Sequence, residues 1–156
     1  MAIEIERKFL VISDAFKVEA ERFQAYRQGY MIGSEKASVR VRISGDQARL
    51  NIKSATLGVR RQEYEYPMPL EDAQRILDDL CEKPLVEKVR YYVRHGAHLW
   101  EVDVFEGDNA GLVVAEIELG AVDERFEKPD WLGKEVSDDV RYYNSNLGKH
   151  PYKDWT

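Results

Sequence analysis

Cysteine is almost absent from this 156-residue chain, whose single example is Cys81. No internal disulfide can form, so we expect a protein of a reducing compartment such as the cytoplasm. Cys81 falls in a predicted amphipathic helix, where we expect a small core residue rather than a nucleophile. Histidine is scarce as well. His95, His98 and His150 lack metal-ligand spacing, and we expect them on the surface or in loops.

Long hydrophobic runs and an excess of positive charge are also missing. No apolar run approaches the roughly 18 residues that cross a bilayer, and the chain reaches a charged strand at once. We therefore expect neither a membrane span nor a signal peptide. The net charge of −6 makes nucleic acid a poor partner, because a duplex binder normally carries a basic excess. There is no glycine-rich phosphate-binding loop, so side chains would have to bind any phosphate.

Strand-like runs dominate what is present, with turn signals such as Gly33-Ser34 between several of them. We expect strands over 2–12, 24–33, 37–44, 47–55, 60–68, 85–95, 98–106 and 112–120. Helical spacing occurs at 70–81, within 137–147 and, over a short stretch, within 13–20. No linker or repeat divides the chain. The sequence therefore predicts one mainly β domain, residues 1–156, with eight strands in an antiparallel barrel or sandwich.

The first strand carries an unusual set of charges, because Glu4, Glu6 and Lys8 share one face. Later strands repeat the pattern with like charges together, as in Arg40 and Arg42. An antiparallel sheet with one wet face alternates apolar and polar residues in any case, and for a single strand that explanation suffices. It does not suffice for the whole set, because like charges on one face repel each other. A ligand or counter-charge across a cavity would relieve that repulsion.

Two placements of the charged rows are open if eight strands close into a barrel. Either the charges coat the outside, or they line a polar tunnel. In the second case helices or a partner subunit must cover the apolar outer rows. A dry tunnel with so many charges is implausible, because each unpaired buried ion costs several kcal/mol. A wide, hydrated tunnel that holds metal ions and a polyanion avoids that cost.

Such a tunnel would have two sets of charged side chains. The basic set suits phosphate, because Arg offers a rigid fork of donors and Lys a point charge. The acidic set suits a hard divalent cation such as Mg²⁺ or Mn²⁺. The basic set is Lys8, Arg40, Arg42, Lys53, Lys88 and Arg90, and the acidic set is Glu4, Glu6, Glu63, Glu65, Glu101, Asp103, Glu116 and Glu118. Together they indicate a metal-chelated polyphosphate. The carboxylates alone could act as an acid/base pair on a sugar, but the abundant basic residues disfavour that alternative.

The series of motifs resembles the CYTH superfamily, the triphosphate tunnel metalloenzymes. The motifs are Glu4-x-Glu6-x-Lys8, Arg40-x-Arg42, Lys53, Glu63-x-Glu65, Lys88-x-Arg90, Glu101-x-Asp103 and Glu116-x-Glu118, in the family's order over essentially the whole chain. Membership implies a closed eight-stranded antiparallel tunnel with a charged interior, helices on the outside and at one mouth, a triphosphate substrate and a divalent metal. The chain looks most like the short bacterial inorganic tripolyphosphatases in three runs: Ile5-Glu6-Arg7-Lys8-Phe9-Leu10-Val11, Arg27-Gln28-Gly29-Tyr30 and Arg61-Gln62-Glu63-Tyr64.

Individual roles follow as hypotheses from the resemblance and the charge pattern. Lys8 would either contact phosphate or act as a base, and Tyr30 would either help it to position water or pack at the tunnel mouth. Arg141 lies near a C-terminal helix that helps to close the tunnel in this family, and would touch substrate or remain on a solvated face. We assign metal binding to Glu4, Glu6, Glu63, Glu65, Asp103, Glu116 and Glu118.

The leading function is hydrolysis of inorganic tripolyphosphate to pyrophosphate and phosphate. Alternatives are a thiamine triphosphatase, a nucleoside triphosphatase or a class IV adenylate cyclase, each of which needs an organic-group pocket that the sequence does not reveal. A polyphosphate- or nucleotide-binding module without turnover would need only the basic set. The apolar outer rows, which include Tyr64, Tyr66, Tyr91 and Trp100, exceed what a few short helices obviously cover, so a homodimer stays open.

Overall fold

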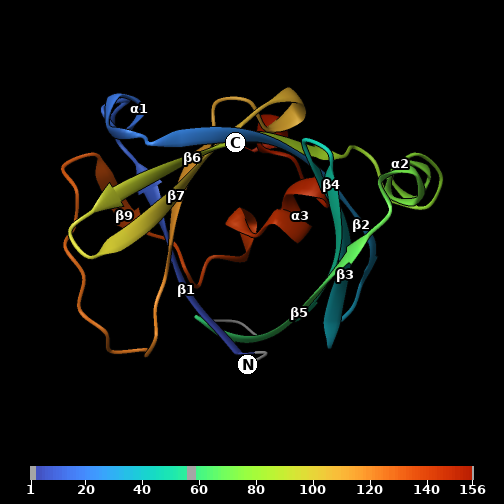
Figure 1. Ribbon diagram of the computed structural model, residues 1–156, viewed down its shortest axis with the longest axis horizontal. Coiled ribbons are helices and arrows are strands. Elements are labelled where there is room, and N and C mark those ends of the chain that lie inside the picture. Colours follow the sequence, from blue (N-terminus) through green and yellow to red (C-terminus); the bar gives the residue numbers. More distant parts are fainter. Residues whose placement is uncertain (1–2, 56–58, 156) are drawn as a thin grey trace.

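Eight antiparallel strands form a closed ring in the computed structural model, which describes residues 3–55 and 59–155 (Figure 1). The ring runs β5-β4-β3-β2-β6-β7-β8-β1 and closes by pairing of β1 with β5. Its strands are β1 (Ile3–Val11), β2 (Arg22–Gly33), β3 (Ala37–Ser44), β4 (Gln47–Ser54), β5 (Arg60–Met68), β6 (Val86–His95), β7 (His98–Phe105) and β8 (Val113–Glu118). The eight predicted strands and their closure into a barrel are confirmed, apart from residue 2, which lies outside the described residues.

A ninth strand, β9 (Leu132–Glu135), lies outside the ring and was not predicted. It pairs with the last residues of β1, beyond the point where β5 leaves that edge. Gly133 permits the close approach, because a Cβ there would lie 2.8 Å from Ile12 Cγ2 and 3.1 Å from the Leu10 carbonyl oxygen. Four residues with a central glycine show no alternation, so no strand signal marks this segment.

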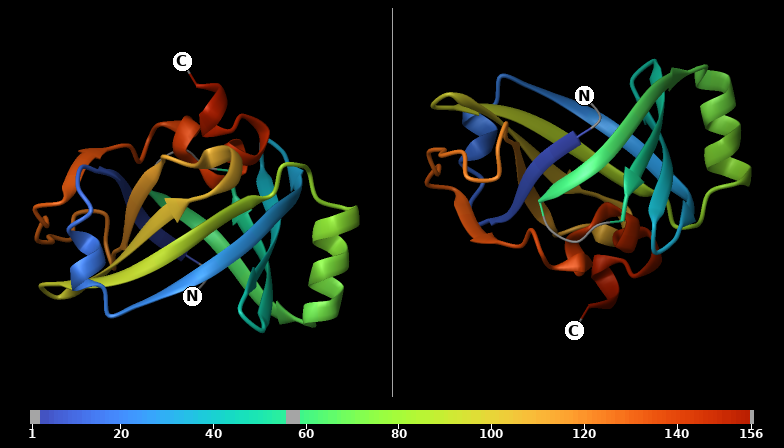
Figure 2. Two further views of the ribbon diagram at one scale, coloured as in Figure 1. Left: turned by 90° about the horizontal axis from the view of Figure 1, so that it is seen from above. Right: turned by 90° about the horizontal axis from the view of Figure 1, so that it is seen from below.

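The apolar rows of the strands face outward and are covered by three groups of elements. Helix α2 (Leu70–Asp79) packs on β3 and β4, where Ala73 and Leu77 meet Val41. Helix α1 (Phe16–Glu19) and the chain between β8 and β9 cover β6, β7 and β8. Helix α3 (Asn144–Lys149) lies across one end of the barrel, together with the rest of the C-terminal segment (Figure 2). The charged rows consequently face the interior, which settles the choice that the sequence left open.

The largest apolar cluster contains Trp100 and Trp131, both 1% exposed or less, and shows that the outer wall is well covered at this place. Phe9 and Phe16 join the two indoles through edge-to-face contacts with centroids about 6 Å apart. Trp100, one of the outer apolar residues that short helices did not obviously cover, is therefore buried by elements of its own chain. Tyr64 remains 40% exposed, and the homodimer stays a prediction.

The helices largely follow their predicted positions. Helix α2 ends at Asp79 rather than at residue 81, and Leu80 is exposed. Cys81 is buried beyond the helix end against the backbone of Gly29, as expected of a small core residue. The segment predicted within 137–147 is a single-turn 3₁₀ helix, Val140–Tyr142, followed by α3. In the part of the chain that the structure describes, no helix has the length and apolar character to cross a bilayer.

Replacing Trp131 with alanine tests whether the outer cover is a true core. We expect the Trp131→Ala variant to lose about 3–5 kcal/mol of unfolding free energy, because it removes a fully buried indole that packs against Phe16 and Trp100. Urea denaturation measures the loss. The control is Val122→Ala in the same loop, where the side chain is 53% exposed and a change within about 0.5 kcal/mol is expected. Similar values for the two variants would contradict the assignment.

Candidate functional site: a charged tunnel

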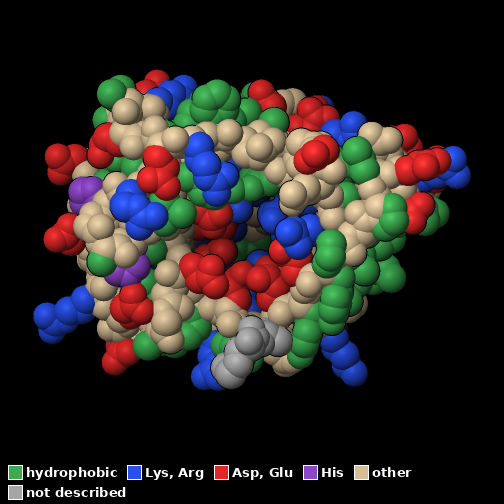
Figure 3. Space-filling view, in the orientation of Figure 1, with side chains coloured by type: hydrophobic (Ala, Val, Ile, Leu, Met, Phe, Trp, Pro, Cys, Tyr) green, Lys and Arg blue, Asp and Glu red, His purple; other side chains and the backbone are tan. Residues whose placement is uncertain are grey.

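The barrel encloses a cavity of about 660 Å³ whose lining is mostly charged. Acidic and basic side chains surround the hollow at the centre of the space-filling view (Figure 3). The predicted site residues that line it are Glu4, Glu6, Lys8, Tyr30, Arg40, Arg42, Lys53, Glu63, Glu65, Lys88, Arg90, Glu116 and Glu118. Two predicted site residues, Asp103 and Arg141, do not line it.

Strand register brings the acidic residues of β1, β7 and β8 together. Glu6 lies directly opposite Glu118, and Glu116 lies opposite Lys8 on one side and Glu101 on the other. Carboxylates directly opposite each other on neighbouring strands destabilise a sheet when nothing compensates them. The pairing therefore leaves an excess of negative charge along this wall of the cavity.

Crowding of these carboxylates appears in their pKa values. Burial and the nearby carboxylate of Glu116 raise the pKa of Glu6 well above its usual value. Burial also raises the pKa of Glu4 to about 7, against the opposing charge of Lys53, whose Nζ lies 3.0 Å from Glu4 Oε1. Glu116 is buried too, but the cations Lys8 and Arg90 hold its pKa well below the usual range. The wall thus favours the uptake of positive charge at Glu4 and Glu6.

A second wall of the cavity, which we call the basic wall, has an excess of positive charge. There the guanidinium groups of Arg40, Arg42 and Arg90 are crowded together. Arg40 makes no ion pair with any carboxylate in the described residues, and its Nε is buried without a hydrogen-bond partner. Burial and the neighbouring charges of Arg40 and Arg90 lower the pKa of Arg42. Arg42 and Arg90 also lie 4.7 and 5.2 Å from the ring centroid of Tyr26, which lies close to both. This wall would be stabilised by an anion.

Asp103 holds two of the basic residues in place from within the wall. Its carboxylate is fully buried, accepts from Lys88 Nζ at 2.8 Å and accepts from Arg90 Nε and Nη2 at 2.7 and 2.9 Å. Although burial opposes ionisation, these cations lower the pKa of Asp103. Both carboxylate oxygens are therefore occupied, and the contacts favour a positioning role rather than the metal role that the sequence suggested.

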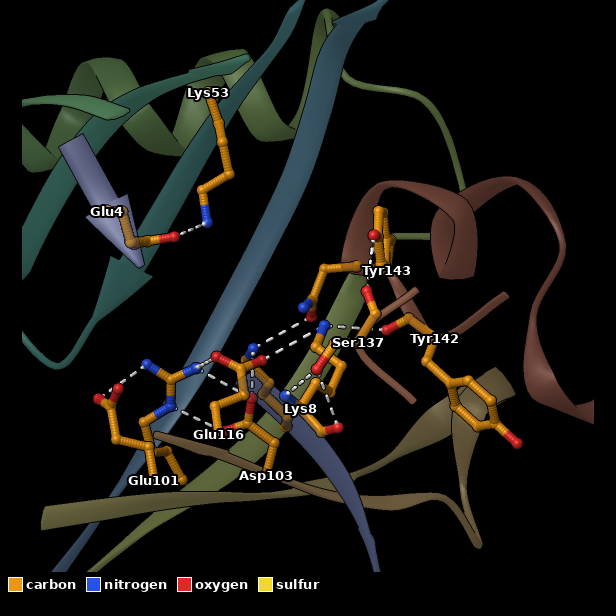
Figure 4. A network of polar contacts seen from close by, with 12 residues as sticks. Glu4, Lys8, Lys53, Glu101, Asp103, Glu116, Ser137, Tyr142 and Tyr143 are labelled. Atoms are coloured by element: carbon orange, nitrogen blue, oxygen red, sulfur yellow. Dashed lines mark hydrogen bonds and ion pairs between the residues drawn. The ribbon is translucent and has the colours of Figure 1, made fainter. Parts of the chain in front are cut away.

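Lys8 is held by the C-terminal segment (Figure 4). Its Nζ donates to the carbonyl oxygen of Tyr142 at 3.1 Å, lies 3.4 Å from Glu116 Oε1 and lies 5.4 Å from the ring centroid of Tyr143. Tyr30 instead pairs with Arg40 across β2 and β3. The predicted cooperation of Tyr30 with Lys8 thus has no direct contact to support it.

A second mixed cluster lies on β4 and β5. Lys53 Nζ lies between Glu4 and Glu63, at 3.0 and 3.6 Å. Asn51 Nδ2 donates to Glu63 at 2.9 Å and to Glu65 at 3.3 Å. Asn51 was visible in the sequence as the residue two positions before Lys53 on the same face, but its neutral side chain kept it out of the predicted site.

The C-terminal segment contributes lining residues that sequence reasoning missed. Arg141 is more than half exposed and is bound to Asp139 beside it, so it stays on the solvated side. The two residues that follow the 3₁₀ turn, Tyr143 and Asn144, line the cavity instead. A short polar stretch has no periodic signal that points to a tunnel, and only the folded chain brings it there.

The cavity fits a divalent cation in charge and in donor type. Glu4, Glu6, Glu116 and Glu118 offer carboxylate oxygens, which hard cations prefer, and their repulsion is only partly compensated. Within residues 3–55 and 59–155, no three Asp, Glu, His or Cys side chains are already gathered as metal ligands. The match between the cavity and a divalent cation therefore rests on the carboxylate oxygens available and on their uncompensated negative charge.

A closed antiparallel barrel around a tunnel with one acidic and one basic wall defines the structural class of this protein. A model of the CYTH domain family matches residues 2–145, and the chain belongs to that family. An inorganic triphosphatase of Acetivibrio thermocellus is 50% identical over 155 residues, which are 99% of each chain. An inorganic triphosphatase of Nitrosomonas europaea is 35% identical over 148 residues, which are 92% of this chain and 95% of the relative.

A solved structure gives the same result for the fold. The crystal structure of an inorganic triphosphatase matches with a TM-score of 0.68 and 33% identity, over 93% of this chain and 97% of that chain. The expected family and the expected tunnel fold are thereby confirmed.

Neutralising Asp103 tests its positioning role. We expect Asp103→Asn to lose about 3–5 kcal/mol of unfolding free energy, because Lys88 and Arg90 would remain buried without their counter-charge. Thermal and urea unfolding measure the loss. The matched control is Asp139→Asn, which breaks a largely solvated ion pair with Arg141 and should change stability little. Equal effects would show that the buried pairs contribute no more than the exposed one.

Proposed function

We propose that this protein hydrolyses inorganic tripolyphosphate to pyrophosphate and phosphate with the help of a divalent cation. The proposal rests on the two walls of one cavity. The basic wall lacks anions to balance its arginines, and the acidic wall lacks cations to balance its carboxylates. Arg40, Arg42 and Arg90 repel one another on the first wall, and Glu6 and Glu118 face each other on the second. A metal-chelated polyphosphate supplies both missing charges at once. Two relatives that align with this chain over 95% or more of their own length are inorganic triphosphatases.

The basic wall would bind the phosphate oxygens and stabilise the charge that spreads over them during phosphoryl transfer. Such transfer depends mainly on positioning and electrostatics, and arginine forks suit phosphate geometry. Arg90 is fixed by Asp103 and by Glu101, whose Oε2 lies 3.1 Å from Arg90 Nη1. A donor that is already oriented need not be reorganised during the reaction, which is the source of its catalytic advantage.

The acidic wall would hold the cation. Glu4, Glu6, Glu116 and Glu118 are the candidate ligands, and Glu63 and Glu65 also line the cavity. A bound divalent cation neutralises phosphate charge and lowers the pKa of a bound water. Both Mg²⁺ and Mn²⁺ prefer oxygen ligands, and we propose that the site binds either of them.

Lys8 is best explained as a phosphate ligand. Its Nζ donates to the Tyr142 carbonyl oxygen and lies 3.4 Å from Glu116 Oε1, and Lys8 lines the cavity. An ammonium group has three donors, so a donor remains for a phosphate oxygen beside these contacts. Of the two roles open at the outset, contact with substrate is therefore the one we propose.

The cytoplasm remains the compartment that we propose from the single cysteine.

Product formation from three substrates tests the proposal. We expect release of phosphate and pyrophosphate from tripolyphosphate with Mg²⁺ or Mn²⁺, and far less product from thiamine triphosphate or ATP. A chelator should abolish the activity, because the acidic wall then lacks its cation. Turnover that survives the chelator would contradict the metal requirement. Binding of all three compounds without product would indicate a binding module.

Replacing Glu6 with glutamine separates a metal ligand from a structural residue. We expect Glu6→Gln to lose activity by about 100-fold or more, the range seen when one group that stabilises the transition state is removed. Its metal-free stability should not fall, because the change removes one of two carboxylates that face each other at Glu6 and Glu118.

Steady-state kinetics and the melting temperature with and without Mg²⁺ measure these effects. Glu19→Gln, on the exposed surface of α1, is the control with the same chemical change. Near-normal activity of Glu6→Gln would remove Glu6 from the metal site.

A further inference from the structure

Asn144, the first residue of α3, has an amide whose two ends face different surroundings. Its Oδ1 accepts from Lys88 Nζ at 3.1 Å and from Gln28 Nε2 at 3.3 Å. Its Nδ2 has no hydrogen-bond partner among the described residues, although Asn144 lines the tunnel. Nδ2 is not fully buried, so this unpartnered donor has accessible surface where Asn144 borders the cavity.

The orientation of this amide is determined by Lys88. An ammonium group has donors only, so the atom of Asn144 that faces Lys88 Nζ must be the oxygen. The reverse orientation would direct two N–H groups at a buried cation. The NH₂ group must therefore lie on the other side of the amide, where Asn144 borders the cavity.

Lys88 itself is poorly placed to reach a ligand in this arrangement. Its side chain is 1% exposed, and two of its three N–H donors go to Asp103 and Asn144. Gln28, the other donor to Asn144, is fully buried. Asn144 thus joins two buried donors of the barrel wall to the open space of the tunnel.

We infer that Asn144 is a substrate-binding residue, whose Nδ2 donates a hydrogen bond to a phosphate oxygen at the end of the tunnel that α3 covers. The inference rests on the proposed function for the identity of the anion. Lys88 then acts largely through Asn144, because the positive charge behind Oδ1 polarises the amide and strengthens the N–H donor on its far side. The C-terminal segment contributes to the site chemically as well as covering it.

Nuclear magnetic resonance of the wild-type protein gives the direct test. The isotope-labelled, metal-free protein is titrated with tripolyphosphate, and the side-chain NH₂ resonances of Asn144 are followed. We expect them to move downfield in parallel with the Arg40 and Arg42 guanidinium signals. Movement of the arginine signals without a change at Asn144 would overturn the inference. It would leave the proposed function intact, since the anion would still be bound in the tunnel.

Substitutions give the energetic test. Asn144→Asp keeps an oxygen toward Lys88 but replaces the N–H donor with a second carboxylate oxygen, so we expect KM for tripolyphosphate to rise at least on the order of tenfold. The metal-free affinity for tripolyphosphate, measured by calorimetry, should fall by a similar factor. If Asn144 serves only to anchor Lys88, the variant forms an ion pair there and keeps its KM, and that result would overturn the inference.

A second variant controls for the added negative charge. Ser145→Asp places the same charge on the next residue, which also borders the cavity, and should change KM by less than about threefold if Asn144 has a specific contact. Equal losses in Asn144→Asp and Ser145→Asp would reduce the effect to general repulsion and overturn the inference. Failure of the wild-type protein to turn over tripolyphosphate is a different outcome, which contradicts the proposed function itself.

Discussion

The fully buried carboxylate of Asp103 binds two cations of the tunnel wall, and this pair of contacts is the constraint on which the site depends. It fixes Lys88 and Arg90 on the neighbouring strand, and Arg90 in turn reaches Glu101 and approaches Glu116. A buried ion pair contributes little net stability over an apolar pair, but loss of one partner leaves a charge that the interior cannot solvate. This constraint makes β6 and β7 a rigid wall against which the rest of the site is arranged.

The remaining charges of the tunnel are not compensated as completely as those around Asp103. Arg40 has no carboxylate partner in the described part of the chain, and Glu6 faces Glu118. Repulsion of this kind lowers the stability of the ligand-free protein. Ligands of opposite charge relieve it, and this relief adds to their binding free energy. The apolar outer cover, centred on Trp100 and Trp131, stabilises the ring in spite of that repulsion.

Most of the fold could be predicted from the sequence because strand alternation is a local property. Each predicted run of alternating residues became a strand, and like charges at i and i+2 share a face by the geometry of the extended chain. Strand β9 was missed because four residues around Gly133 carry no pattern. Its formation depends on the free edge of β1, which exists only after β5 has turned away from that strand.

The site was predicted unevenly for the same reason. Residues such as Glu4, Lys8 and Arg40 were identified by type and spacing, and all of them line the cavity. Asp103 has the same type and spacing, yet its contacts with two cations withdraw it from the lining. Arg141 has the right charge, but the direction of the 3₁₀ turn leaves it on the surface and brings the next residues inward.

By itself, the sequence determined the number of strands in the ring, their positions along the chain, the charged face of most of them and the chemistry that those charges suit. These properties follow from the period of two along an extended chain. Only the tertiary structure decided that the charged faces point inward. It decided which carboxylates lie opposite each other and which, like Asp103, pair with Lys and Arg side chains of the wall. It also decided that Tyr143 and Asn144 complete the tunnel. Those outcomes depend on closure of the ring and on contacts between residues more than 50 positions apart in the chain, such as Lys88 and Asn144, which are 56 positions apart.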